Sequence, residues 1–338
     1  MRNTITNHLH CSAVLLTAAI ILTATLGTTT SAHEIDQTSR VIWPDLIPIP
    51  VGFEPEGIEL GKDQDFFVGT LAFSGNHTNA GAIYKGNLVT GEGQILVQPT
   101  GKPIAGLSYD ERTDYLYAAT GFGNPNRERG VNVYAATSGR LLGEIIFGDD
   151  MVINDVLVTE RAVYCTDSIS TTLYKIPLED NGKVFSSTVE KIEMTGFEMN
   201  PAKYNANGLA GDFDGKELVI VNISTGVLYL VDTESGAATP VNVQGEEQLF
   251  QNGDGLFMDG RTLYIMRNFA QKIAVVQLSD DLTQGTFIKN IVSDDFSIPT
   301  TITGYGNCIY AINTHYLELT AEGADPTLVE TEVVKVYK

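Results

Sequence analysis

Short apolar segments alternate with polar turns from about residue 50 to the end of the chain, and no window keeps the 3.6-residue apolar period of a helix. One apolar segment recurs at a spacing of about 50 residues, each time as the second strand of a repeat. Its copies lie at residues 66–68, 115–117, 163–165, 218–220, 263–265 and 309–311. This periodicity predicts an all-β chain folded as a six-bladed β-propeller.

The last repeat is one strand short. After Tyr316 it has room for one clear strand, at residues 332–337. A segment near the start of the chain, residues 39–46, can supply the missing strand and close the ring, which removes two exposed sheet edges. We therefore expect one propeller domain spanning residues 33–338.

The N-terminal segment has the features of a secretory signal peptide. It carries Arg2, no acidic residue, an apolar run at residues 13–26 and small residues at 30–32. The run is shorter than the roughly 18–20 residues that cross a bilayer, although an uncleaved anchor remains an alternative. We expect cleavage after Ala32, a secreted or otherwise extracytoplasmic protein, and no membrane association after cleavage.

The chain is acidic, with a formal net charge of −21. Nucleic acids and anionic membranes are therefore poor partners, and we expect a small molecule instead. The sequence does not specify an oligomeric state. Cys165 and Cys308 fall in the third and sixth repeats, too far apart in a six-bladed ring for a disulfide, which predicts two buried thiols.

Four polar residues occupy one equivalent place in four repeats, at the start of the first strand: Glu56, Asn154, Asn207 and Asp254. Asn-Gly and Asp-Gly pairs are also common turn formers, so each residue alone fits a turn. Together they are better explained by the propeller, in which the first strands converge on the axis and bring distant residues into one shell. We predict that all four are metal ligands.

The four side chains offer only oxygen donors. Two carboxylates and two amides suit Ca²⁺ completed by water, with Mg²⁺ or Mn²⁺ as alternatives. Zinc or copper prefers imidazole or thiolate, and beyond the near-terminal His33 the chain after the signal contains only His77 and His315.

At these positions the chain resembles the family of senescence-marker protein, gluconolactonase and luciferin-regenerating enzyme, over about residues 50–316. Glu56, Asn154, Asn207 and Asp254 match the family's metal-binding Glu, Asn, Asn and Asp. The resemblance implies metal-dependent hydrolysis of lactones, and in some members of organophosphate esters, with Asp254 as the catalytic base or nucleophile. Because a carboxylate bound to a cation is a weak base, we expect Asp254 to act through water or to leave the ion during turnover.

Two departures from the family pattern concern the substrate. Sugar-lactone members carry an Arg two residues before the third-repeat Asn, where this chain has Val152, and the aromatic after the first Glu is absent. The missing Arg argues for a less polar substrate than gluconolactone. A calcium-stabilised propeller that binds a ligand or protein without catalysis remains an alternative. A strictosidine-synthase-like condensing enzyme, which would use a Glu and no metal, fits the amide-rich shell less well.

Overall fold

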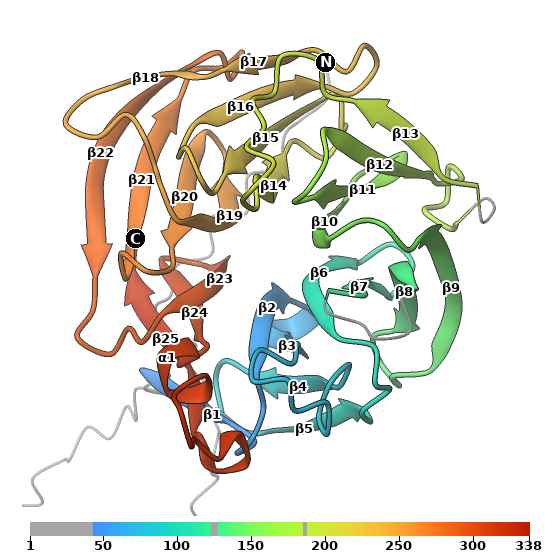
Figure 1. The fold of residues 1–338 in the computed structure, drawn as a ribbon, viewed down its shortest axis with the longest axis vertical. Helices are drawn as coiled ribbons and strands as arrows, with labels where there is room; N and C mark the ends of the chain where they lie inside the picture. The colour runs from blue at the N-terminus through green and yellow to red at the C-terminus, as the bar shows by residue number, and fades with distance from the viewer. Residues whose placement is uncertain (1–42, 123–127, 185–187) are drawn as a thin grey trace, which may run out of the picture.

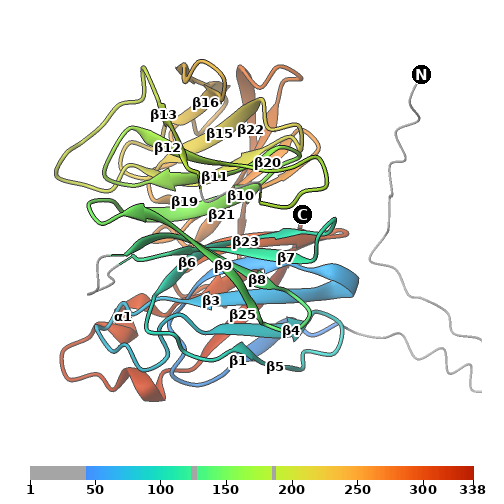
Figure 2. The ribbon, with the colours of Figure 1, turned by 90° about the vertical axis from the view of Figure 1, so that its right-hand side faces the viewer.

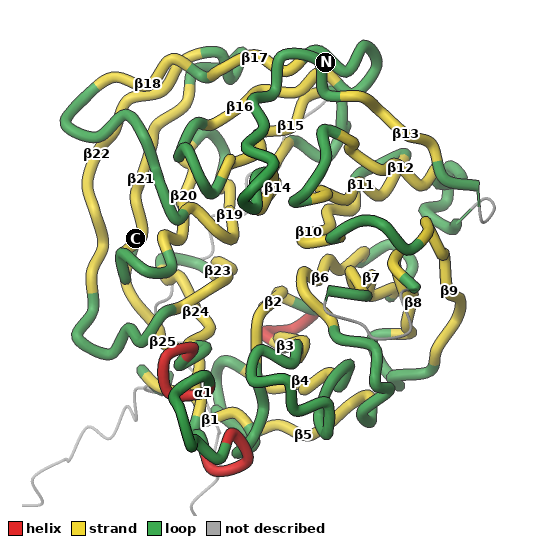
Figure 3. The backbone as a smooth tube through the Cα atoms, in the orientation of Figure 1, coloured by secondary structure: helices red, strands yellow, loops and turns green. Residues whose placement is uncertain are grey.

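The chain forms six small antiparallel sheets arranged in a ring around a common axis (Figure 1). The computed structural model describes residues 43–122, 128–184 and 188–338, so the predicted signal peptide at residues 1–32 lies outside the described residues. Strands are the main regular structure of the ring, and helix is confined to short segments (Figure 3). The six-bladed β-propeller predicted from the sequence is confirmed.

Each blade contributes one strand to each of four concentric positions. The innermost strands are β2 (Pro55–Leu60), β6 (Ile104–Asp110), β10 (Ile153–Val158), β14 (Ala206–Gly211), β19 (Gly253–Asp259) and β23 (Pro299–Tyr305). The second strands are β3 (Asp65–Thr70), β7 (Tyr115–Thr120), β11 (Ala162–Asp167), β15 (Glu217–Asn222), β20 (Thr262–Arg267) and β24 (Cys308–Asn313). All six apolar segments that define the sequence repeat fall in these second strands.

The third strands are β4 (Ile83–Asn87), β8 (Arg129–Ala135), β12 (Thr172–Pro177), β16 (Leu228–Asp232), β21 (Lys272–Leu278) and β25 (Thr331–Tyr337). The outer strands are β5 (Gly93–Val97), β9 (Leu141–Gly148), β13 (Glu190–Glu193), β17 (Ala238–Pro240), β22 (Gln284–Val292) and β1 (Leu46–Ile49). A short strand, β18 (Asn242–Gln244), adds in parallel to β22. The helical segments are α1 (Tyr316–Leu319), η1 (Lys62–Gln64) and η2 (Pro326–Leu328). Figure 2 shows α1 projecting from one face of the ring.

An N-terminal strand closes the last blade, as predicted, but it lies later in the chain than expected. β1 pairs antiparallel with β25, from Leu46 opposite Val334 to Ile49 opposite Thr331. The predicted strand at residues 39–46 is therefore wrong in position: it overlaps β1 only at Leu46, and residues 39–42 lie outside the described residues. The pairing segment is the one whose alternate side chains can be buried, with Ile47 1% and Ile49 3% exposed.

The hydrophobic core is divided into six clusters, each between two adjacent blades. Because both faces of a second strand pack against neighbouring blades, β11 and β24 are buried at every position. Cys165 and Cys308 are both buried, in two different clusters, as expected. In the part of the chain that the structure describes, no helix is long and apolar enough to cross a membrane.

Every innermost strand contains a bulge at the same place. The register with the second strand shifts across the second and third residues of β2, β6, β10, β14, β19 and β23. A β-bulge leaves residues unpaired and re-aims their side chains. The bulges therefore turn one side chain from each blade toward the axis at a common level.

Candidate metal centre

The four predicted ligands all occupy the first bulge position of their strands. Glu56, Asn154, Asn207 and Asp254 are the second residues of β2, β10, β14 and β19. Their equivalent placement, deduced from the repeats, is thus present in the structure. The remaining two blades place Ala105 and Thr300 at this position.

The glycines that follow three of these residues allow close approach between blades and do not form hairpin turns. A Cβ built on Gly208 would lie 2.1 Å from the Asp254 carbonyl oxygen, and one on Gly57 would lie 2.3 Å from the Ala105 carbonyl oxygen. Gly255 meets Thr301 of the next blade in the same way. Neighbouring innermost strands therefore touch backbone to backbone at the level of the site.

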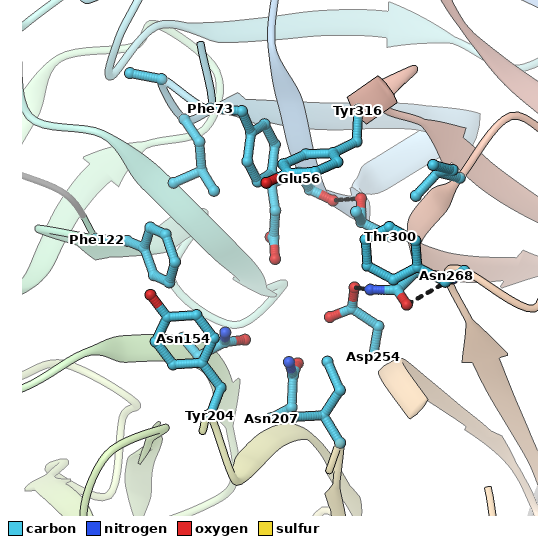
Figure 4. A pocket seen from close by; sticks show the side chains of 15 residues that line it. Glu56, Phe73, Phe122, Asn154, Tyr204, Asn207, Asp254, Asn268, Thr300 and Tyr316 are labelled. Carbon is cyan, nitrogen blue, oxygen red and sulfur yellow. Dashed lines mark hydrogen bonds between the residues drawn. The ribbon is translucent and has the colours of Figure 1, made fainter. Parts of the chain in front are cut away.

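The four side chains form the floor of one cavity of about 320 Å³ on the face that carries α1. Figure 4 shows Glu56, Asn154, Asn207 and Asp254 pointing toward a shared space, with aromatic side chains around it. The four residues are 6%, 7%, 4% and 4% exposed, respectively. The structure thus brings together residues that are up to 198 positions apart in the chain, from Glu56 to Asp254 (254 − 56 = 198).

Asn268 is a site residue that sequence reasoning missed. Its Nδ2 donates a 2.6 Å hydrogen bond to Oδ2 of Asp254, and its Oδ1 accepts one from the Phe269 backbone N–H. Asn207 also hydrogen-bonds Asp254 through its side chain. These amides hold the Asp254 carboxylate in one orientation. Asn268 directly follows β20, which ends at Arg267.

The last residues of the six second strands do not line the pocket: Thr70, Thr120, Asp167, Asn222, Arg267 and Asn313. Asp167 accepts hydrogen bonds from Val152 N, Ile169 N and Ser170 Oγ and so shapes local turns. Arg267 forms an ion pair with Glu247. These strand-end residues stabilise loops of the scaffold.

Thr300 completes the floor without offering a free hydroxyl. Its Oγ1 donates to the Glu56 carbonyl oxygen at 2.7 Å and lies 3.1 Å from Thr314 Oγ1, which in turn donates to the Pro55 carbonyl oxygen. These bonds tie the last blade to the first directly beneath Glu56. The strand that carries Glu56 is therefore fixed by the ring closure.

Burial and the negative charge of neighbouring carboxylates both raise the pKa values of the two floor carboxylates, Glu56 and Asp254. Burial raises the pKa of Glu56 well above its usual value, and the Asp254 and Asp155 carboxylates raise it further. Burial also raises the pKa of Asp254 to about 7, although the hydrogen bond from Asn268 opposes the shift. The described pocket lining contains no Lys, Arg or His, so no cationic side chain there balances the negative charge of the two carboxylates when both are ionised.

The donor set fits a hard divalent cation. Two carboxylates cancel the charge of such an ion, and two amide oxygens complete a set of the kind that Ca²⁺ prefers. In residues 43–122, 128–184 and 188–338, no group of three or more His, Cys, Asp or Glu side chains could hold a metal. At the candidate site only two of the four oxygen donors, Glu56 and Asp254, belong to these residue types, and the other two are amides.

Asp155 follows Asn154 but belongs to the other side of the ring. Its Oδ1 accepts from Val156 N at 2.9 Å and its Oδ2 from Leu209 N at 3.1 Å, and it lines a separate cavity of about 330 Å³. Glu59, near the place of the family aromatic, lines that second cavity too. Asp155 thus fastens β10 to β14 beneath the site.

Neither histidine of the described chain reaches the pocket. His77 is exposed, and the His315 ring lies between Glu318 and Glu332, with Nδ1 2.9 Å from Glu318 Oε1 and Nε2 3.1 Å from Glu332 Oε1. The Glu332 hydrogen bond raises the pKa of His315 to about 9. His315 instead fixes the start of α1, which carries Tyr316 into the pocket wall.

Comparison with known proteins establishes likeness in fold. No protein-family model matches the sequence, and no curated protein matches it either. The major allergen Mala s 1 of Malassezia sympodialis aligns with a TM-score of 0.63 at 15% identity, over 87% of this chain and 96% of the allergen.

Two further solved structures that align with this chain are described as enzymes. A luciferin-regenerating enzyme aligns with a TM-score of 0.57 at 13% identity, over 86% of this chain and 95% of the enzyme. A putative oxidoreductase of Thermus thermophilus, described as a glucose dehydrogenase, aligns with a TM-score of 0.56 at 12% identity, over 86% of this chain and 99% of that protein. The structural neighbours therefore include the luciferin-regenerating enzyme expected from the four-residue motif, and at these identities the likeness is one of fold.

Proposed function

We propose that this protein is an extracytoplasmic, divalent-cation-dependent hydrolase of lactones or related esters. One observation carries the proposal: four oxygen-donor side chains from four blades form the floor of a single pocket whose walls are largely apolar. Ligand pockets commonly combine apolar walls with a few convergent polar groups. The enzyme names of two structural neighbours support a catalytic role, although fold alone does not specify function.

Glu56, Asn154, Asn207 and Asp254 are the residues that would hold the cation, with Ca²⁺ preferred and Mg²⁺ or Mn²⁺ as alternatives. A divalent ion on this floor would polarise the substrate carbonyl and stabilise the negative charge that develops on its oxygen. The face-to-face contact of neighbouring bulges holds the four side chains rigidly, which favours a preorganised site.

Asp254 is the residue that would take a proton. Its Oδ2 is held by Asn268, and its carboxylate faces the pocket beside Asn207. In lactone hydrolysis the water oxygen bonds to the carbonyl carbon, the ring C–O bond breaks, and the proton removed by Asp254 passes to the departing ring oxygen, leaving a hydroxy acid. Asn268 acts as a positioning residue because it touches Asp254 and fixes its orientation.

The decisive experiment measures hydrolysis of a lactone and aryl-ester panel by the purified protein with added Ca²⁺ and with chelator, together with thermal unfolding. Turnover that requires the cation and that Asp254→Asn abolishes supports the proposal. A cation-dependent melting temperature without turnover on the whole panel overturns the hydrolase and favours the non-catalytic binding propeller. Absence of any response to cations overturns the metal centre itself.

A further inference from the structure

Aromatic side chains from five of the six blades surround the mouth of the pocket. Phe73 follows β3, Phe122 follows β7, Tyr204 precedes β14, Phe269 follows β20 and Tyr316 begins α1. Tyr204 is 50% exposed and Phe269 is 53% exposed, so packing of the blades does not account for either ring. Large apolar side chains gathered at the rim of a cavity indicate a surface kept for a ligand.

The rings form two groups that face each other across the polar floor. In one group, the Tyr316 ring makes edge-to-face contacts with the rings of Phe73 and Phe269. The ring centroids are 5.4 Å apart with an interplanar angle of 90° for Phe73, and 5.8 Å apart with an angle of 85° for Phe269. In the other, the Phe122 and Tyr204 centroids are 5.6 Å apart at 51°. Figure 4 shows Phe73 and Tyr316 on one side of the shared space and Phe122 and Tyr204 on another, with Asp254 and Asn207 on the remaining sides.

Two members of these walls, Phe73 and Phe269, are anchored through hydrogen bonds at neighbouring residues. Glu54 accepts hydrogen bonds from Ser74 N and Oγ, at 2.8 and 2.5 Å, next to Phe73. The Phe269 backbone N–H is bonded to Asn268 at 2.6 Å, so the residue that orients Asp254 also fixes this wall. Such anchoring reduces the entropy lost when a ligand becomes ordered between the rings.

One apolar wall residue is held in an unfavourable backbone conformation. Ile298 lines the pocket with φ of 51°, in the left-handed region that a β-branched residue rarely adopts. Its carbonyl oxygen accepts a hydrogen bond from Thr314 N, and its side chain is buried. Strain of this kind persists where surrounding contacts enforce it, commonly at ligand sites.

The described lining offers few polar atoms that a polyhydroxylated substrate could use. Apart from the four floor side chains and the hydroxyls of Tyr204 and Tyr316, the polar side chains of the lining are Thr300 and Asn268, which are engaged by protein groups. The described lining has no Arg or Lys to bind hydroxyl or phosphate oxygens. A sugar lactone would leave hydroxyl groups without partners among the rings, which is unfavourable. A planar apolar ring instead matches the two aromatic groups in shape and polarity.

We infer that the pocket selects substrates with an aromatic ring on the ester oxygen that departs, such as aryl-fused lactones or aryl esters. The inference rests on the proposed hydrolase function and names its substrate class. The substrate ring lies between the Phe122–Tyr204 pair and the Phe73–Tyr316–Phe269 group while its carbonyl faces the polar floor. Tyr204 and Phe269 are the specificity-determining residues that can be changed with least disturbance of the core.

The test compares two lactones that differ only in the fused ring, 3,4-dihydrocoumarin and δ-valerolactone, in wild type and in the double variant Tyr204→Leu/Phe269→Leu. We expect the ratio of kcat/KM for dihydrocoumarin to kcat/KM for valerolactone to fall by about tenfold or more, since each lost ring contact contributes up to about tenfold. Comparing each substrate across variants removes the difference in their intrinsic reactivity. Equal losses on both lactones, or none on either, overturn the inference.

The matched control is Phe213→Leu/Tyr337→Leu, which removes two rings that are 54% and 64% exposed and that do not line the pocket. This control should match wild type on both substrates. A second measurement does not depend on turnover: 2-naphthol binding is followed by fluorescence in the presence of chelator. The Kd should rise by about tenfold in the pocket variant and stay unchanged in the control.

The two measurements separate the inference from the proposed function. If neither lactone is hydrolysed with Ca²⁺, Mg²⁺ or Mn²⁺, the hydrolase proposal fails, and naphthol binding still decides whether an aromatic subsite exists. If naphthol does not bind, or binds the pocket variant as tightly as wild type, the aromatic subsite is overturned whatever the hydrolysis shows.

Discussion

The substitution Gly208→Ala tests whether the site depends on backbone contact between neighbouring blades. The added Cβ would lie 2.1 Å from the Asp254 carbonyl oxygen, 2.9 Å from Leu256 N and 3.1 Å from the Asp254 carbonyl carbon. These are backbone atoms, so no side chain can swing aside. An ordinary contact requires about 3.4 Å or more, and β14 and β19 must therefore separate by about 1 Å at the level of the candidate metal centre.

Two consequences follow from that separation. Overpacking in a rigid interior costs about 1–3 kcal/mol, so the free energy of unfolding should fall by that amount. Asn207 and Asp254 also move apart, and a displacement of about 1 Å is large for a site that must hold a cation in fixed geometry. We expect Ca²⁺ affinity to fall by at least about tenfold.

The matched control is Gly143→Ala in β9, where an added Cβ meets no atom within 4 Å and φ is not positive. Unfolding in denaturant measures stability, and calorimetric titration measures Ca²⁺ affinity. Gly143→Ala should leave stability unchanged or raise it slightly and leave affinity unchanged. If Gly208→Ala behaves like Gly143→Ala, the Asn-Gly pair is not a close-approach bulge and our account of the site is refuted.

Three other outcomes are expected. Ca²⁺ should raise the melting temperature of wild type, and Glu56→Gln should remove most of that increase, whereas an unchanged increase would exclude Glu56 as a ligand. The raised pKa of His315, about 9, contributes stability that is present below its unfolded pKa of about 6.5 and is lost as pH rises through 9. His315→Gln should therefore flatten the stability profile between these values by about 1–3 kcal/mol, and a profile identical to wild type would show that the His315–Glu332 contact is energetically silent. Ile47→Ala/Ile49→Ala in the closing strand should destabilise the whole ring by about 4 kcal/mol or more in chemical denaturation, and a shift below about 1 kcal/mol would mean that closure by β1 is dispensable.

Much of the fold was readable from the sequence because propeller blades repeat. The second strands are buried on both faces, so they appear as apolar segments of nearly constant spacing, and their count predicts the number of blades. The closing strand was placed too early because residues 39–46 and 46–49 are both apolar enough to pair. Burial of Ile47 and Ile49 against the last and first blades decides the register, and that contact joins the two ends of the chain.

The candidate ligands were found because equivalent positions in a repeat become neighbours at the axis. Asn268 and Thr300 were missed because the equivalent positions of the other repeats carry different residue types. Asn268 acts only through its hydrogen bond to Asp254, and Thr300 acts through the ring closure at Pro55 and Glu56. The aromatic groups at the mouth were missed for a similar reason. Their residues come from loops of different length in five blades and share no period in the sequence.

The local pattern of apolar and polar residues thus determined the strands, the number of blades and the four polar positions. Strand periodicity and burial dictate which residue types occupy successive positions, so both can be deduced from the sequence. The tertiary structure alone decided that Asn207-Gly208 and Asp254-Gly255 lie in bulges and not in turns, since only the neighbouring blade's backbone makes the glycines necessary. It also decided which rings surround the floor. Those contacts join residues that are far apart in the chain, and their energies depend on distances that the order of residues does not record.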